Sequence, residues 1–174
     1  MSAVPRPQQA PPAAAQPALA TRPMRVSDLD IVLEIERSAY AFPWSRGNFI
    51  DSLAAGYWAC LLCDESSGEL VAYAVAMDGV GESHLLNLTV QPAHEHRGHA
   101  RRLLRELVAH ARERGSMSLW LEVRQSNQRA RAVYQRYGFA EVGTRRGYYP
   151  AAGQQREDAQ VLRLDLESFK DEQR

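Results

Sequence analysis

The sequence has no long hydrophobic run and no excess of charge. Its apolar stretches are all much shorter than the roughly 20 residues that a helix needs to span a bilayer, which excludes a transmembrane helix and a membrane partner. Lys and Arg together number 21, and Asp and Glu also number 21. A chain that is neutral overall has no global field to attract nucleic acid, so we expect no nucleic-acid partner.

Cysteine is scarce, and the two that occur, Cys60 and Cys63, form the segment CLLC. This spacing resembles that of redox and zinc sites. The surrounding residues are typical of a strand, where side chains three positions apart point to opposite faces, so the two thiols should diverge. Zinc would also need two more ligands, and no second cysteine pair supplies them. We therefore expect two reduced structural cysteines and no metal.

The chain is long enough for one domain with a sizeable core. Residues 1–22 are rich in Pro, Ala and Gln and lack the apolar segment of a signal peptide, which predicts a disordered extension and a cytoplasmic protein. The domain itself should span residues 23–168, with residues 169–174 as a short tail. We expect a monomer.

Hydrophobic periodicity predicts helices and strands in alternation. A capping box at 27–30 and a second cap at Ser45 should start the first two helices, and two more should follow Gly98 and Asn127. The predicted strands are 57–63, 70–77, 84–90, 117–123, 139–142 and 159–166, with 145–158 as a long loop between the last two. This order indicates an α+β fold, a mixed sheet with a parallel crossover in its middle.

The segment HEHRGHARRLL, residues 94–104, joins a strand to the most regular of these helices. Unpaired backbone N–H groups at a helix start suit an anion such as phosphate. The segment is not a P-loop, because it lacks Gly-Lys-Ser/Thr, and its single Gly98 does not make a dinucleotide fingerprint. Gly98 alone is weak evidence for any ligand.

The same segment holds three histidines, His94, His96 and His99, spaced as H-x-H-x-x-H. A single carboxylate accompanies them and no distant Cys/His cluster completes a site, so we interpret them as surface or phosphate-adjacent side chains. The neighbouring arginines at 101, 102 and 105 are predicted to lie on the solvated side of the helix.

The segment LTVQPAHEHRGHARRLL resembles the acetyl-CoA signature of the GNAT acetyltransferase superfamily, Gln/Arg-x-x-Gly-x-Gly/Ala. Gly98 and Ala100 match that signature, whereas Glu95 stands where the family usually has Gln or Arg. The segments AFPWS, SLWLEVRQSNQRARAVYQRYGF, RRGYYP and EDAQVLRLDL further resemble RimI-type members, over residues 24–166. This resemblance implies the GNAT fold, a splayed and mostly antiparallel sheet with flanking helices. The pantetheine arm would lie between strands ending near Val90 and Val123.

The resemblance also implies site residues. Glu122 matches the general base and Tyr134 the acid that protonates the CoA thiolate. Taken from the residues alone, Glu122 is better interpreted as a solvated or ion-paired strand glutamate and Tyr134 as a core tyrosine. The residues implied to bind acetyl-CoA are Leu88, Thr89, Val90, His96, Arg97, Gly98, His99, Ala100, Arg101 and Asn127. Asn127 would also cap its helix.

RimI-type enzymes acetylate the N-terminal alanine of a small-subunit ribosomal protein, which is therefore the implied partner. The segments 42–44 and 148–150 would border the acceptor groove, although Trp44 could simply pack against the domain. Four acidic residues, Glu36, Asp51, Glu157 and Asp158, are candidates to meet a basic acceptor. The alternatives are acetylation of other N-termini, lysines or a small amine, or an acyl-CoA-binding module without catalysis.

Overall fold

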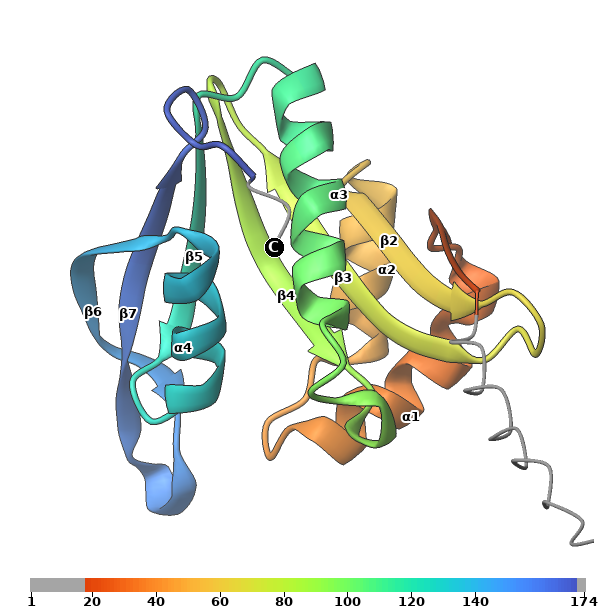
Figure 1. The fold of residues 1–174 in the computed structure, drawn as a ribbon. Coiled ribbons are helices and arrows are strands. Elements are labelled where there is room, and N and C mark those ends of the chain that lie inside the picture. The colour runs from red at the N-terminus through yellow and green to blue at the C-terminus, as the bar shows by residue number, and fades with distance from the viewer. Residues whose placement is uncertain (1–17, 172–174) are drawn as a thin grey trace, which may run out of the picture.

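A single seven-stranded sheet with helices on both faces forms the domain in the computed structural model, which describes residues 18–171 (Figure 1). The strand order is β1-β2-β3-β4-β5-β7-β6. The strands are Leu19–Pro23 (β1), Trp58–Asp64 (β2), Leu70–Asp78 (β3), Glu82–Val90 (β4), Ser118–Arg124 (β5), Ala140–Pro150 (β6) and Arg156–Asp165 (β7). The main helices are Leu29–Ala39 (α1), Arg46–Ala54 (α2), His99–Glu113 (α3) and Gln128–Tyr137 (α4). Within residues 18–171, no helix combines the length and apolar character needed to cross a membrane.

The sheet opens between β4 and β5, which are parallel and are connected through α3. Their pairing runs from Glu82 and Ser118 to Leu85 and Leu121 and stops there, although β4 continues to Val90 and β5 to Arg124. The other neighbouring strands in the described part of the chain are antiparallel. The predicted mixed, splayed sheet with a central parallel crossover is thus confirmed.

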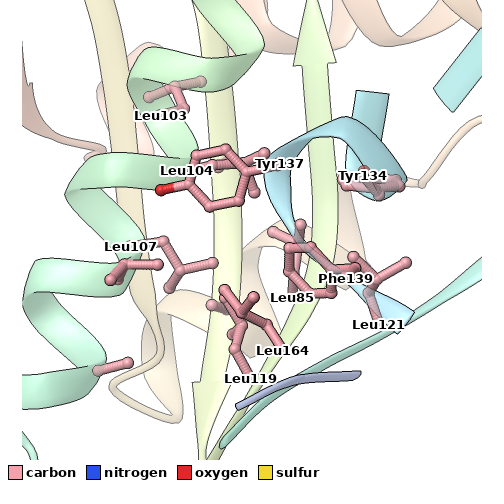
Figure 2. Packing of buried hydrophobic residues seen from close by; sticks show 14 of the residues in the cluster. Leu85, Leu103, Leu104, Leu107, Leu119, Leu121, Tyr134, Tyr137, Phe139 and Leu164 are labelled. Atoms are coloured by element: carbon pink, nitrogen blue, oxygen red, sulfur yellow. The ribbon is translucent and has the colours of Figure 1, made fainter. Parts of the chain in front are cut away.

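Two hydrophobic clusters cover the two faces of the sheet. The larger one packs α3 and α4 against the sheet through Leu104, Leu107 and Tyr137, among others (Figure 2). The smaller one packs α1 and α2 against the other face. Cys60 belongs to the first cluster and Cys63 packs against the second, which confirms that the thiols diverge; both are free.

The helix starts follow local side-chain chemistry. Ser45 accepts a hydrogen bond from the backbone N–H of Asn48, which confirms the cap of α2. The first helix starts at Leu29, and its N-cap is Asp28 rather than the predicted Ser27, because Ser27 lies inside a 3-10 turn. Asp28 closes that turn by accepting from the backbone N–H of Arg25.

The folded domain begins earlier and ends later than predicted. Leu19–Pro23 is an edge strand that pairs with β2, so the boundary at residue 23 is wrong by several residues. At the other end, the ring of Phe169 lies 5.2 Å from that of Tyr137. The remainder of the predicted extension, residues 1–17, and of the predicted tail, residues 172–174, lie outside the described residues.

The predicted loop 145–158 is also wrong, because most of it is strand. β6 extends to Pro150 and β7 begins at Arg156, so the two form a long hairpin with a short connection. The ladder is irregular between Arg145 and Tyr149, where the backbone N–H of Gly147 donates to Asp158 instead. The Gly, Pro and polar residues of 145–158 are typical of turns and do not alternate with apolar residues, so hydrophobic periodicity did not predict this strand.

Candidate active site

A cavity of about 730 Å³ fills the opening beside β4, bounded by the loop before α3, the start of α3 and one side of α4. It brings together almost all the residues predicted to bind the co-substrate. Those lining it are Leu88, Thr89, Val90, His96, Gly98, His99, Ala100, Arg101 and Asn127. Arg97 is exposed and does not line the cavity. Asn127 also accepts from the backbone N–H of Ala130, which confirms its role as helix cap.

The start of α3 presents backbone donors to this cavity. Gly98 adopts a left-handed conformation with φ of 82°, and open space surrounds the position of a Cβ. Arg102 is the first residue whose backbone N–H returns to the helix, reaching Gly98 O at 3.1 Å. Among the described residues, the backbone amides of His99 and Ala100 have no partner, and together with the positive end of the helix dipole they suit an anion. No acidic residue occupies the first turn.

Strand β4 supplies a second set of donors. The backbone N–H of Gln91 donates to Val71 on β3, and Thr89 stands opposite Tyr73. Successive residues in an antiparallel strand alternate in direction, so the amides of Leu88 and Val90 face away from β3 toward the split. The carbonyl of Leu88 accepts from the hydroxyl of Tyr40, in agreement with this orientation.

Glu95, the atypical residue of the signature, is paired with a cation from the opposite wall. Its carboxylate lies 2.6 Å from Nη1 of Arg129, near the start of α4. Both residues line the cavity, so this ion pair spans from the loop before α3 to α4. The negative charge beside the anion site is therefore compensated by Arg129.

Two of the three histidines of this segment contact one another or a neighbouring residue. His94 contacts Glu69 at 2.9 Å, and its ring lies 6.3 Å from that of His99. Burial lowers the pKa of His99, and the nearby His94 and Arg97 lower it further. In the described part of the chain, no group of three or more His, Cys, Asp or Glu side chains could hold a metal ion.

The three arginines lie outside the buried face of α3, as predicted, but they also make contacts within the protein. Arg101 and Arg105 contact Asp171, at 3.3 and 2.8 Å, and are only partly exposed. Arg102 donates to the carbonyl of Leu19 at 2.5 Å. These arginines hold both ends of the described chain against the helix.

Tyr134 lies on α4, buried at the cavity wall. Its ring packs edge-on against Phe139, with 5.7 Å between centroids, within the larger core cluster (Figure 2). Among residues 18–171 its hydroxyl makes no hydrogen bond. Burial raises the pKa of Tyr134, and the neighbouring Tyr40 and Tyr149 raise it further, so the phenol holds its proton firmly.

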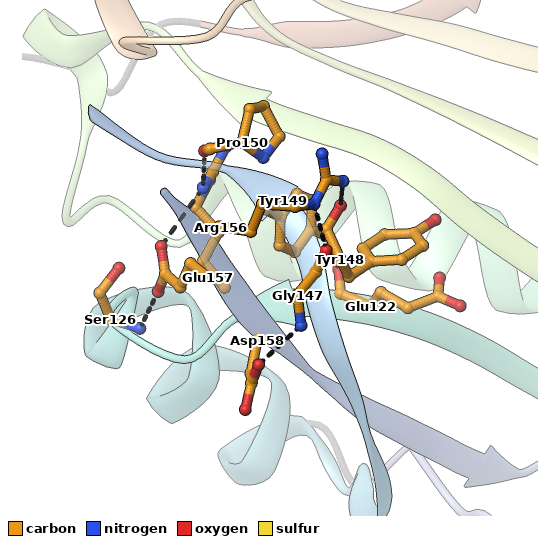
Figure 3. Close-up of polar contacts among 10 residues, drawn as sticks. Glu122, Ser126, Gly147, Tyr148, Tyr149, Pro150, Arg156, Glu157 and Asp158 are labelled. Atoms are coloured by element: carbon orange, nitrogen blue, oxygen red, sulfur yellow. Dashed lines mark hydrogen bonds and ion pairs between the residues drawn. The ribbon is translucent and has the colours of Figure 1, made fainter. Parts of the chain in front are cut away.

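Glu122 lies on the other face of the sheet and does not line the cavity. It follows Leu121, the last residue of β5 that pairs with β4, and alternates with the buried Leu121 and Val123. Its side chain is 15% exposed and lies 3.3 Å from the guanidinium of Arg145. Its backbone carbonyl accepts from the hydroxyl of Tyr149 at 3.0 Å (Figure 3).

Aromatic side chains lie near Glu122 on this face of the sheet. We call this region, with Phe42, Arg124 and Tyr149, the second approach to the split. The guanidinium of Arg124 lies 4.4 Å from the ring centroid of Tyr149 and 5.4 Å from that of Phe42, so it connects β6 to the segment between α1 and α2. Tyr148 is 42% exposed. Trp44 packs against Phe49 at 5.2 Å, which favours the packing interpretation for this residue.

Three of the four acidic candidates are engaged within the protein. Glu36 is 1% exposed, and both of its carboxylate oxygens accept hydrogen bonds. Glu157 contacts Arg124 and accepts from the backbone N–H of Ser126, which lowers the pKa of Glu157 (Figure 3). Asp158 accepts from Gly147. Of the four, only Asp51 is exposed and free of such contacts among the described residues.

The sequence profile of the acetyltransferase (GNAT) family matches residues 29–139. The chain belongs to this family. It is 35% identical over 139 residues to the [ribosomal protein bS18]-alanine N-acetyltransferase of Haemophilus ducreyi, covering 80% of this chain and 94% of that enzyme. The crystal structure of the ribosomal-protein-S18-alanine N-acetyltransferase from Escherichia coli superimposes with a TM-score of 0.78 at 33% identity, covering 90% of this chain and 99% of that one. The RimI-type resemblance is thus confirmed, and this GNAT protein is an acetyltransferase.

A more distant GNAT structure agrees in fold. Arabidopsis thaliana NAA60, crystallised in complex with acetyl-CoA, superimposes with a TM-score of 0.75 at 22% identity and covers 85% of this chain and 99% of its own.

The sequence predicted Glu36 only as a candidate to meet a basic acceptor; its burial and hydrogen bonds, and the place of Tyr40 in the cavity wall, were missed. Its spacing could have indicated that Glu36 is buried. Glu36 lies four residues after Val32 and three after Leu33, on the apolar face of α1. Tyr40 ends that helix and lines the cavity, a placement that no local pattern reveals.

Proposed function

We propose that this protein transfers the acetyl group of acetyl-CoA to the α-amine of the N-terminal alanine of ribosomal protein bS18. The observation that carries the proposal is the opening through the sheet, which is approached from both faces. On one face lies a cavity with an anion-binding helix start and Tyr134, and on the other lies Glu122 among aromatic side chains. The names of the relatives supply the acceptor.

The cavity fits the co-substrate. The backbone amides at the start of α3, with Gly98 keeping the approach open and Arg101 beside them, would hold a pyrophosphate. Leu88, Val90 and Asn127 line the remainder of the channel. Acetyl-CoA supplies an activated thioester carbonyl when bound. The amides of Leu88 and Val90 face the split, where they would stabilise negative charge that develops on an oxygen.

Glu122 is proposed to remove the proton of the attacking amine, directly or through one water. An α-amine has a pKa of about 7.7–8.0, against about 10.4 for lysine, so a carboxylate faces a smaller barrier with a protein N-terminus. Tyr134 is proposed to give its proton to the departing thiolate from the opposite face. Attack is direct, and no residue becomes acetylated.

An acceptor assay tests this function. The protein is incubated with acetyl-CoA and a peptide copying the bS18 N-terminus, or the same peptide with its α-amine blocked, and thiol release is followed. We expect turnover only with the free α-amine. Turnover that survives the block would instead indicate a lysine acceptor, and CoA binding without turnover on any amine would favour a binding module. We place this activity in the cytoplasm, where ribosomal proteins are made.

A further inference from the structure

A buried carboxylate on α1 gathers three hydrogen-bond donors from three parts of the chain. Glu36 accepts from the backbone N–H of Trp44 at 2.8 Å, from Nδ2 of Asn87 at 3.2 Å and from the hydroxyl of Tyr73. It is 1% exposed, and Tyr73 is fully buried beside it. Glu36 therefore acts as the acceptor in every one of these contacts, which join α1, β3, β4 and the segment before α2.

This carboxylate determines the direction of the hydrogen bonds that follow. Since Asn87 presents its Nδ2 to Glu36, its Oδ1 faces Thr89 and accepts from Oγ1 of Thr89 at 2.8 Å. The single hydroxyl proton of Thr89 is thereby used. The hydroxyl of Tyr40, 2.9 Å from that Oγ1, must then be the donor.

The second protein partner of Tyr40 leads to the same conclusion. Its hydroxyl lies 3.2 Å from the carbonyl of Leu88, which can only accept. Both partners therefore act as acceptors for the one proton of Tyr40, which they share, and the lone pairs of its oxygen remain for a further donor. Burial raises the pKa of Tyr40, which keeps that proton in place.

Tyr40 holds these lone pairs at the cavity wall. Tyr40, Leu88 and Thr89 all line the cavity, and Tyr40 lies close enough to Tyr134 to influence its titration. Tyr40 also begins the segment that leads to Phe42 at the second approach, and Glu36 anchors this segment through Trp44. An N–H that enters here leaves water and needs an acceptor in return.

We propose that the oxygen of Tyr40 accepts a hydrogen bond from the α-amine of the acceptor peptide, and that Glu36 is a positioning residue that keeps Tyr40 in this acceptor role through Asn87 and Thr89. The inference rests on the proposed function and adds a binding contact to it. Tyr40 would hold the amine nitrogen on the side of the split opposite Arg145 and Glu122, with its lone pair free to attack.

The decisive variant is Tyr40→Phe, which removes the oxygen and keeps the ring. We expect KM for the bS18 peptide to rise roughly tenfold, because a hydrogen bond to a charged or polar donor is lost. The dissociation constant of acetyl-CoA, measured by calorimetry, should stay within about twofold. Tyr57→Phe, which changes a tyrosine at the edge of the smaller core cluster, is the matched control and should alter neither value.

Glu36→Gln tests the positioning role. The introduced amide offers an NH2 group where one carboxylate oxygen stood, so the chain through Asn87 and Thr89 loses its fixed direction. KM for the peptide should rise severalfold with acetyl-CoA binding retained, and combining this change with Tyr40→Phe should add little, since both act through one oxygen. If Glu36→Gln fails to fold, Thr89→Val replaces it and should likewise raise KM.

Peptide affinity is also measured on the enzyme with CoA bound, which needs no turnover. The results then separate the role of Tyr40 from the proposed acetyl transfer to bS18. Turnover with an unchanged KM in Tyr40→Phe would overturn the role of Tyr40 and leave the proposed function standing. A weaker peptide affinity in Tyr40→Phe without turnover in the wild type would support Tyr40 and overturn the proposed function. A change in acetyl-CoA affinity alone would assign Tyr40 to the co-substrate and overturn the inference.

Discussion

Glu122 and Tyr134 reach the split in the sheet from opposite faces, and their surroundings differ accordingly. Glu122 keeps partial contact with solvent and with Arg145, whereas Tyr134 is buried against Phe139. A proton accepted by Glu122 can therefore leave to water. The raised pKa of Tyr134 keeps its phenol protonated before the reaction, so in the proposed mechanism the hydroxyl is available to donate to the departing sulfur.

Replacing Glu122 by Gln should lower kcat/KM for the peptide by about 100-fold or more, within the usual range for a lost general base. The deficit should be largest at low pH. Below the amine pKa of about 7.7–8.0 the acceptor is protonated and needs a base, whereas at higher pH a neutral amine is already present. Measured pH–rate profiles check this. Glu141→Gln, which removes an exposed carboxylate on β6, should retain the wild-type profile.

Tyr134→Phe should lower kcat while the dissociation constant of acetyl-CoA stays near the wild-type value, because the ring and its packing remain. Tyr137 offers a matched control on the same helix. Its buried hydroxyl has no hydrogen-bond partner among the described residues, so Tyr137→Phe should retain kcat and keep or raise stability. Equal losses of kcat in the two variants would contradict the role of Tyr134.

The resemblance predicted most of the residues that line the cavity, and it predicted Glu122 and Tyr134 as base and acid, roles that stay predictions. It did not reveal the chain of hydrogen bonds from Glu36 to Tyr40. These residues are far apart in sequence, since 51 positions separate Glu36 from Asn87, and only the packing of α1 on β4 brings them together. Side-chain contacts between distant elements leave little trace in local periodicity.

Among the elements, the loop before α3 and the start of α4 are linked across the cavity by Glu95 and Arg129. A bound anion at the start of α3 would compete with Glu95 for this arginine. Glu95→Gln should therefore strengthen CoA binding a few-fold, in line with about 0.2–1 kcal/mol for an exposed ion pair. Calorimetry at low and high salt checks this, and the gain should shrink with salt. Arg129→Gln should weaken CoA binding. If Glu95→Gln leaves the affinity for CoA unchanged or lowers it, Glu95 does not compete with the bound anion for Arg129.

The turn into α3 depends on the backbone of Gly98. Its φ of 82° lies in the left-handed region, while space for a Cβ is open, so Gly98→Ala should cost about 1 kcal/mol through backbone strain alone. For a chain of this size, Tm should fall by about 2–4 °C. Gly47→Ala in the first turn of α2 is the control. It has no positive φ and an ordinary contact at 3.5 Å, so its Tm should not fall. Equal Tm values would contradict strain at Gly98.

Elements with strong periodicity or caps were predictable, and irregular edge strands were not. α2, α3 and α4 begin where Ser45, Gly98 and Asn127 indicate. β1 and the outer half of β6 were missed because both lie at sheet edges. Hydrogen bonds to a partner strand keep the backbone of these segments extended, and their sequences lack the alternation of apolar and polar residues. β6 is also exposed along most of its length.

The whole molecule consists of helices on both faces of one sheet that is continuous at one end and open at the other. The parallel pairing of β4 and β5 holds the halves together up to Leu85 and Leu121, and α3 and α4 share one core across the junction. Ion pairs of Arg101 and Arg105 with Asp171 tie the C-terminal segment to α3. The opening is thus a feature of the strand register.

In the proposed reaction, one acetyl group goes to the α-amine of the bS18 alanine. The most direct measurement is to incubate purified bS18 with this protein and acetyl-CoA, and to locate the added mass by fragmentation mass spectrometry. A single acetyl group on the N-terminal alanine, absent when Glu122→Gln replaces the wild type under the same conditions, is the predicted result. Acetyl groups on lysine side chains, or unmodified bS18 after complete consumption of a small-amine acceptor, would contradict the claim.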